Sequence, residues 1–126
     1  MKRAYILHGC CDEEEYFSDE YPSPSNAHWL PWLQKNLLQK GYDCQTPEMP
    51  KPYAGIYKEW KAQFELYPVD ENTSLIGHSC GCGFFLRWLS ETGTKIDKLV
   101  MVAPWLDPEK TPGQVSGLYL ECKSGG

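Results

Sequence analysis

Five residues near the middle of the chain form the pattern glycine, any residue, serine, any residue, glycine. They are Gly77, His78, Ser79, Cys80 and Gly81. Such a pattern places a serine on a sharp turn between a strand and a helix, and the glycines leave room for the two elements to approach each other. The hydroxyl then projects above the amino end of the helix, where it can attack an acyl carbonyl. We therefore predict that Ser79 is a nucleophile on a nucleophile elbow.

The sequence on either side of this pentapeptide predicts the strand and the helix that such a turn requires. Residues 73–77 form a short apolar run typical of a strand, and residues 80–90 have apolar residues at helical spacing. Small residues at 81–83 permit close packing of the helix on the sheet. Because the pentapeptide alone is a weak signal, a strand, turn and helix with an incidental serine is the alternative interpretation.

A serine nucleophile also needs backbone N–H groups that stabilise the developing oxyanion. One donor is expected from Cys80, the residue after the nucleophile. The other is expected from the loop after the first strand, with Cys10 as first choice and Cys11 as second. Because these donors are backbone groups, the thiols are expected to be bystanders.

Neither a phosphate-binding loop nor a metal site is expected. A glycine-rich dinucleotide loop that used Gly81 and Gly83 would need a third glycine where the chain has Leu86, and no Gly-Lys-Ser or Gly-Lys-Thr is present. Zinc sites favour paired Cys or His ligands at characteristic spacing. The chain has only one adjacent cysteine pair and one Cys-x-Cys. We therefore expect no cofactor and no metal.

Apolar segments along the chain alternate between strand and helix patterns, which predicts a parallel sheet with right-handed crossovers. We predict one α/β domain over residues 1–126, with three layers (α/β/α) and a mostly parallel sheet. The continuous apolar run at the fourth strand is typical of a strand covered on both faces. The predicted strands are residues 3–7, 42–46, 73–77 and 98–103, with 115–122 as an edge strand; the helices are one that Ser25 or Asn26 caps and Gly41 ends, 56–67 and 80–90.

The charge and hydropathy of the chain exclude two classes of partner. The formal net charge is -5, whereas a nucleic-acid-binding face is basic. No apolar run approaches the roughly 20 residues of a membrane-spanning helix. The apolar part of residues 1–9 is too short for a secretory signal. We expect a cytoplasmic protein that binds neither nucleic acid nor membranes.

Six cysteines are present, and two readings of them are open. A disulfide framework is typical of small secreted proteins. Here two cysteines are adjacent, two flank the elbow and two stand alone, and no secretory signal is evident. We therefore favour free thiols.

The segment 11–26 is strongly acidic. It carries six Asp or Glu residues and no Lys or Arg, and Pro22 and Pro24 make it irregular. We expect a solvated loop. The alternative is an acidic rim beside the site that repels anionic substrates.

Five motifs in chain order resemble those of a known family. The motifs are 6–9 (Ile-Leu-His-Gly), 27–33 (Ala-His-Trp-Leu-Pro-Trp-Leu), 46–50 (Thr-Pro-Glu-Met-Pro), 75–82 (Leu-Ile-Gly-His-Ser-Cys-Gly-Cys) and 99–105 (Leu-Val-Met-Val-Ala-Pro-Trp). Together they resemble the small serine hydrolases of the YdeN and retinoblastoma-binding-protein-nine type. The resemblance implies an α/β-hydrolase fold with little or no lid, a Ser-Asp-His triad acting on esters or related acyl substrates, and no cofactor. Ser79 matches the nucleophile, whereas Cys10, Cys11 and the acidic segment depart from the family's glycine-rich loop.

The histidine and the acid of such a triad follow the serine in the chain. The three histidines, His8, His28 and His78, all precede Ser79. His28 as a substitute base is weighed against packing beside the neighbouring tryptophans. His78 is expected to point away from Ser79, and His8 to organise the first loop.

Asp107 follows the strand after the elbow and is the candidate acid, although it equally suits a loop or helix-capping position before Pro108. The missing histidine favours either a C-terminally truncated hydrolase, with an α/β-hydrolase-like sheet incomplete at that end, or a shortened protein that binds without cleaving. A sheet that lacks its last strands would expose an apolar edge, which predicts dimerisation or aggregation.

Overall fold

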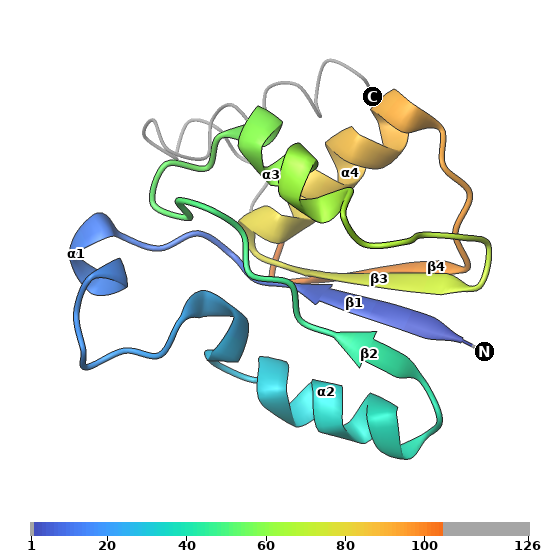
Figure 1. Cartoon of the computed structure of the whole chain (residues 1–126), viewed down its shortest axis with the longest axis horizontal. Coiled ribbons are helices and arrows are strands. Elements are labelled where there is room, and N and C mark those ends of the chain that lie inside the picture. Colours follow the sequence, from blue (N-terminus) through green and yellow to red (C-terminus); the bar gives the residue numbers. More distant parts are fainter. Residues whose placement is uncertain (1, 105–126) are drawn as a thin grey trace.

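Four strands in the described part of the chain form one parallel sheet in the order β2-β1-β3-β4 (Figure 1). The computed structural model describes residues 2–104. The strands are β1 (Arg3–Leu7), β2 (Asp43–Gln45), β3 (Thr73–His78) and β4 (Lys98–Val102), and every pair of neighbours is parallel. The predicted parallel α/β fold is therefore confirmed. The strand predicted at 115–122 lies outside the described residues.

Helices cover both faces of this sheet, which confirms the three-layer arrangement. Figure 1 shows α3 and α4 on one face and α2 on the other. The helices are α1 (Glu13–Tyr16), α2 (Leu30–Gln39), α3 (Tyr57–Phe64) and α4 (Cys80–Thr92), with a short 3-10 helix, η1 (Pro24–Asn26).

Alternate residues of β1 supply both halves of the core. Ala4 and Ile6 pack with Leu30 of α2, whereas Tyr5 and Leu7 pack with the aromatic residues of α3 and α4. Successive side chains of a strand point to opposite faces, so a central strand covered on both faces must be apolar throughout. This is why β1 reads as a continuous apolar run.

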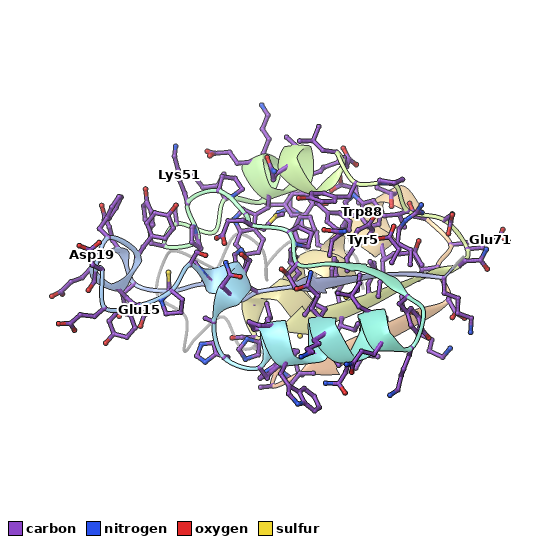
Figure 2. All side chains as sticks on the ribbon, turned by 60° about the horizontal axis from the view of Figure 1, so that its bottom comes forward. Tyr5, Glu15, Asp19, Lys51, Glu71 and Trp88 are labelled. Carbon is purple, nitrogen blue, oxygen red and sulfur yellow. A yellow bond between two sulfur atoms is a disulfide. The ribbon has the colours of Figure 1, made fainter. Side chains whose placement is uncertain are left out.

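The larger half of the core is aromatic. Trp60, Phe64, Phe84 and Phe85 are fully buried, and Phe64 makes edge-on contacts with Phe85 and Trp88 at ring-centroid distances of 5.3 and 5.1 Å. Such contacts are the favoured geometry of aromatic pairs. In Figure 2, Tyr5 and Trp88 lie in this layer between the sheet and the helices. The packing fixes α4, and with it the turn from which α4 starts.

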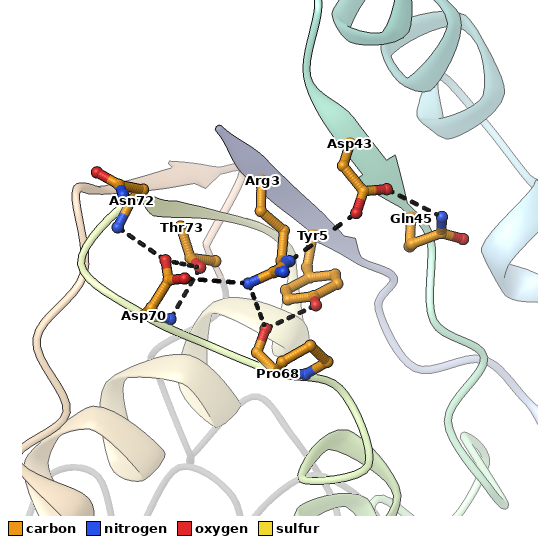
Figure 3. A network of polar contacts seen from close by, with 8 residues as sticks. All are labelled: Arg3, Tyr5, Asp43, Gln45, Pro68, Asp70, Asn72 and Thr73. Carbon is orange, nitrogen blue, oxygen red and sulfur yellow. Dashed lines mark hydrogen bonds and ion pairs between the residues drawn. The ribbon is translucent and has the colours of Figure 1, made fainter. Parts of the chain in front are cut away.

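A polar network at the amino ends of the strands joins β1, β2 and the loop before β3 (Figure 3). Arg3 of β1 pairs with Asp70 at 3.3 Å and with Asp43 of β2 at 3.9 Å. The Tyr5 hydroxyl donates to the Pro68 carbonyl at 2.7 Å. A hydrogen bond from the Asn72 N–H, helped by Arg3, lowers the pKa of the Asp70 carboxyl. This network ties the loop before β3 to β1.

Two local predictions were wrong at the first helix and the acidic segment. The helix begins at Leu30 rather than beside Ser25 or Asn26, which lie in η1. His28 has a φ of 56°, which interrupts any helix there, and Pro31 in the first turn suits a start at Leu30.

The acidic segment, predicted as an irregular loop, contains both α1 and η1.

The fourth strand also differs from its prediction. Val100 and Met101 are 44% and 41% exposed, so β4 is not covered on both faces by the described residues. Among those residues β4 lies at one end of the sheet. Within the described residues, β4 is therefore more exposed than we expected.

Candidate active site

Ser79 occupies the turn between β3 and α4. Its φ is 55° and its ψ is -120°, a conformation that few residues other than glycine adopt. Its N–H donates to the Val102 carbonyl at 3.0 Å, and its carbonyl accepts from the Cys82 N–H at 3.0 Å. These bonds attach the turn to β4 on one side and to the first turn of α4 on the other, so that the strained backbone is held in place.

Three glycines let the elements around Ser79 approach closely. A Cβ atom at Gly81 would lie 2.7 Å from the His8 carbonyl oxygen and 2.8 Å from that of Leu7. At Gly77 it would lie 2.9 Å from the Cys82 Cα, and at Gly9 it would lie 3.0 Å from the Ser79 Cβ. The two glycines of the pentapeptide thus permit packing of α4 on β1 and β3, and the third lets the loop after β1 lie against the serine.

A pocket of about 440 Å³ opens at the carboxyl ends of the strands. One wall comes from the loop after β1 and from the turn around Ser79, and the other from the acidic segment. The lining residues are His8, Gly9, Cys10, Cys11, Glu15, Tyr16, Tyr21, Pro22, Pro24, Ala27, His28, His78, Ser79 and Ala103. Figure 2 shows Glu15 and Asp19 at one end of the molecule, far from Glu71. Because several residues of the acidic segment, from Glu15 to Pro24, line the pocket, that segment shapes it.

A disulfide joins Cys10 to Cys80, across 70 positions of the sequence. This corrects the prediction of free thiols for these two residues. The physical reason is topological: β1 and β3 are parallel neighbours, so the residues that follow them meet at one edge of the sheet. Cys44 and Cys82 are free thiols, and burial raises the pKa of each to about 11. Burial, together with the nearby Glu15 and Asp12, also raises the pKa of Cys11 to about 11.

His8 is buried and holds two loops together. Its Nε2 accepts the Met49 N–H at 2.9 Å, and its Nδ1 lies 2.7 Å from the Gly9 carbonyl oxygen. Since Nε2 accepts, the proton is on Nδ1, which donates to Gly9. Burial lowers the pKa of His8, so the ring is neutral although Glu48 Oε2 lies 3.4 Å from Nε2. His8 thus fixes the start of the loop that carries Cys10, as expected for a residue that organises this loop.

His8 predicts a loss of stability in mild acid. A histidine whose folded pKa lies below the unfolded value of about 6.5 contributes fully above that pH and destabilises as the pH falls below it. Between pH 7 and pH 5.5 we expect wild type to lose roughly 1 kcal/mol more unfolding free energy than His8→Gln, whose side-chain oxygen can still accept the Met49 N–H. Urea unfolding at both pH values measures this difference. Equal losses in the two proteins would contradict the neutral assignment.

His28 and His78 both line the pocket that contains Ser79. Their ring centroids lie 5.4 Å apart, and the Trp29 ring lies 5.1 Å from His78. Burial, and secondly the neighbouring His28, lower the pKa of His78. The structure thus brings these two imidazoles together at the site, rather than placing His28 only beside tryptophans. The sequence carried no local signal for this pair, because fifty positions separate the two residues.

Three further predictions concern the candidate acid, a metal site and a membrane-spanning helix. Asp107, the candidate acid, lies outside the described residues. Within residues 2–104, no three His, Cys, Asp or Glu side chains are grouped so that they could hold a metal ion. The helices in this part of the chain are all too short or too polar to cross a bilayer.

The parallel sheet, covered on both faces and carrying a serine between β3 and α4, defines the class of α/β-hydrolase folds. The family model described as serine hydrolase matches residues 20–118. The chain belongs to this serine hydrolase family.

Individual relatives agree with this class. The chain is 37% identical over 90 residues to the "Putative hydrolase YdeN" of Bacillus subtilis (strain 168), a match that covers 70% of this chain and 42% of that protein. The crystal structure of the B. subtilis ydeN gene product is similar with a TM-score of 0.70 and 27% identity, over 98% of this chain and 61% of that one. Polyneuridine aldehyde esterase shares the fold, with a TM-score of 0.53 and 16% identity over 86% and 43% of the two chains.

Proposed function

We propose that the chain is an esterase-like hydrolase in which Ser79 attacks the carbonyl carbon of an ester or related acyl substrate. The observation that carries the proposal is the position of Ser79, strained between β3 and α4 and facing a pocket of about 440 Å³. The N–H groups of Cys80 and Cys10 are the proposed oxyanion donors. The disulfide between these residues supports their proximity.

In the proposed reaction, negative charge develops first on the carbonyl oxygen of the substrate. As the Ser79 oxygen bonds to the carbonyl carbon, negative charge grows on the carbonyl oxygen, and fixed N–H donors stabilise it. The amino end of α4 adds a partial positive charge at the same place. The carbon–oxygen bond to the leaving group then breaks, and the alkoxide departs as an alcohol with the proton that the Ser79 hydroxyl lost. Water hydrolyses the acyl-serine, which releases the carboxylic acid and restores the serine hydroxyl. Asp107 is proposed as the acid of the triad. The wall that contains Tyr16, Tyr21 and Glu15 suits an apolar, uncharged acyl group better than an anionic one.

A second candidate function is binding without catalysis. It is favoured by one observation: the general base of this class is a histidine that follows the serine, and all three histidines of these 126 residues precede Ser79. The match to the YdeN protein covers 42% of that protein's length. On this second reading the pocket holds an acyl ligand that Ser79 does not cleave.

Hydrolysis of p-nitrophenyl acetate distinguishes the two candidates. Turnover by the folded chain that disappears in Ser79→Ala supports the hydrolase. Retained binding of a non-hydrolysable acyl analogue, with turnover no faster than in Ser79→Ala, supports the binding protein.

We also propose a cytoplasmic location and a dimer that forms through the β4 edge. Within the described residues β4 is one edge of the sheet, and the backbone groups along that edge together with exposed Val100 and Met101 favour association. We expect sedimentation velocity to show a dimer for wild type and a monomer for Val100→Lys, because a charge at the edge opposes strand pairing. A wild-type chain that sediments as a monomer at micromolar concentrations would contradict this proposal.

A further inference from the structure

The disulfide connects the two residues whose N–H groups are the proposed oxyanion donors. Cys10 follows β1 and Cys80 opens α4, on either side of Ser79. We propose that the Cys10–Cys80 disulfide positions the Cys10 N–H opposite the Cys80 N–H, so that a dithiol reductant switches the oxyanion hole off and reoxidation switches it on. This inference rests on the proposed hydrolase function.

The Cys80 end of the bond is firmly held. Cys80, the first residue of α4, is 2% exposed and belongs to the aromatic half of the core. The N–H of Ser79, the residue before Cys80, donates to the Val102 carbonyl of β4, and the Ser79 carbonyl accepts from the Cys82 N–H. The Cys80 N–H is therefore placed by the sheet and by the helix, whatever the redox state of its sulfur.

The Cys10 end is held less firmly. It lies in the loop between β1 and the acidic segment, where the Cys11 N–H reaches the Pro52 carbonyl at 3.4 Å, a long hydrogen bond. Gly9, the residue before Cys10, lies against Ser79. The disulfide ties Cys10 itself covalently to the buried Cys80.

Reduction can start from the pocket. Cys10 is partly exposed and lines the pocket, whereas Cys80 is buried. A thiolate of the dithiol attacks the Cys10 sulfur, which breaks the S–S bond and releases Cys80 as a thiolate that takes up a proton. The second thiol of the reductant then displaces Cys10, which is protonated in turn. The products are two protein thiols and one oxidised, cyclic dithiol, so two electrons and two protons are transferred.

The expected consequence is a displaced donor. Two thiols cannot occupy the space of one covalent bond, so the sulfurs separate, and the less firmly held loop moves. Removing one oxyanion donor costs about 10²–10³ in rate. Because the donor acts on the transition state, the loss belongs in the chemical step and not in ground-state binding.

The test is the inactivation kinetics of the full chain with a fluorophosphonate, before and after dithiothreitol. For wild type we expect the maximal inactivation rate constant to fall about 100-fold on reduction, with the half-saturating probe concentration changed less than about threefold, and to recover on reoxidation. Cys10→Ala should show the low rate constant in both conditions. Cys44→Ala, which removes a buried thiol of β2 outside the site, should respond to reduction as wild type does.

Intact mass and amide hydrogen exchange make each outcome decisive. Oxidised wild type should carry two fewer reactive thiols after denaturation than reduced wild type, and exchange at residues 9–12 should be at least tenfold slower in the oxidised chain. Equal inactivation rate constants and equal exchange in the two redox states would overturn this inference while leaving the hydrolase in place. If Ser79 is not labelled in either state, the proposed function itself fails, and the switch fails with it.

Discussion

Replacing Ser79 by alanine is expected to lower the rate constant for fluorophosphonate labelling at least about 10³-fold. The probe forms a covalent bond to the serine oxygen, and Ser79 is the serine that faces the pocket from a strained strand-to-helix turn. Loss of a nucleophilic serine in enzymes of this chemistry costs several orders of magnitude, and only transition-state binding remains. The rate constant is measured from time courses at several probe concentrations.

Ser90→Ala provides the matched control for this prediction. Ser90 is exposed and lies near the opposite end of α4, so its loss removes a hydroxyl of the same helix without touching the pocket. It should label as wild type does. Labelling of Ser79→Ala at the wild-type rate would show that the probe reacts elsewhere and would remove the basis of the hydrolase proposal.

The second large effect is expected from Gly81→Ala, on stability rather than on chemistry. The added methyl group would lie 2.7 and 2.8 Å from the carbonyl oxygens of His8 and Leu7. Because both contacts are with backbone carbonyls, of Leu7 at the end of β1 and of His8 directly after it, α4 must shift away from β1. We expect a loss of about 3 kcal/mol of unfolding free energy, at the upper end of the usual cost of overpacking. Thermal and urea denaturation measure the loss.

Gly83→Ala is the control, two residues further along the same helix. A Cβ atom there would meet no heavy atom within 4 Å, and the residue lies inside α4. Alanine in a helix interior is favoured over glycine by roughly 0.5–1 kcal/mol, so this variant should be as stable as wild type or more so. If the two variants were equally stable, α4 would not contact β1 at Gly81 as described.

The layers of the fold were predictable because the sequence pattern reports burial directly. The run that became β1 is apolar on both faces, and the spacing of Trp60 and Phe64 indicates the buried side of α3, although Ile56, on the same predicted face, is 40% exposed. The turn at Ser79 was predictable for a related reason: its two glycines are required by close backbone contacts, so they leave a mark in the sequence.

The walls of the pocket could not be predicted in the same way, because they depend on contacts between distant segments. Tyr16 and Phe17 pack on Tyr53 at ring-centroid distances of 5.3 and 5.8 Å, and no local pattern in the acidic segment indicates that contact. The pairing of His28 with His78 is equally non-local.

The disulfide was missed although the sequence held a signal for it. Cys10 and Cys80 are both predicted oxyanion donors, and two residues that donate to one oxygen must be neighbours. Spacing along the chain favours free thiols, but proximity at the sheet edge is set by the order of the strands.

Peptide mapping of the fluorophosphonate adduct tests the assignment of Ser79 most directly. Oxidised wild type is labelled to completion, digested and sequenced by mass spectrometry. The proposed function predicts a single adduct on the side-chain oxygen of Ser79. An adduct on another residue, or none on a folded chain, would contradict it.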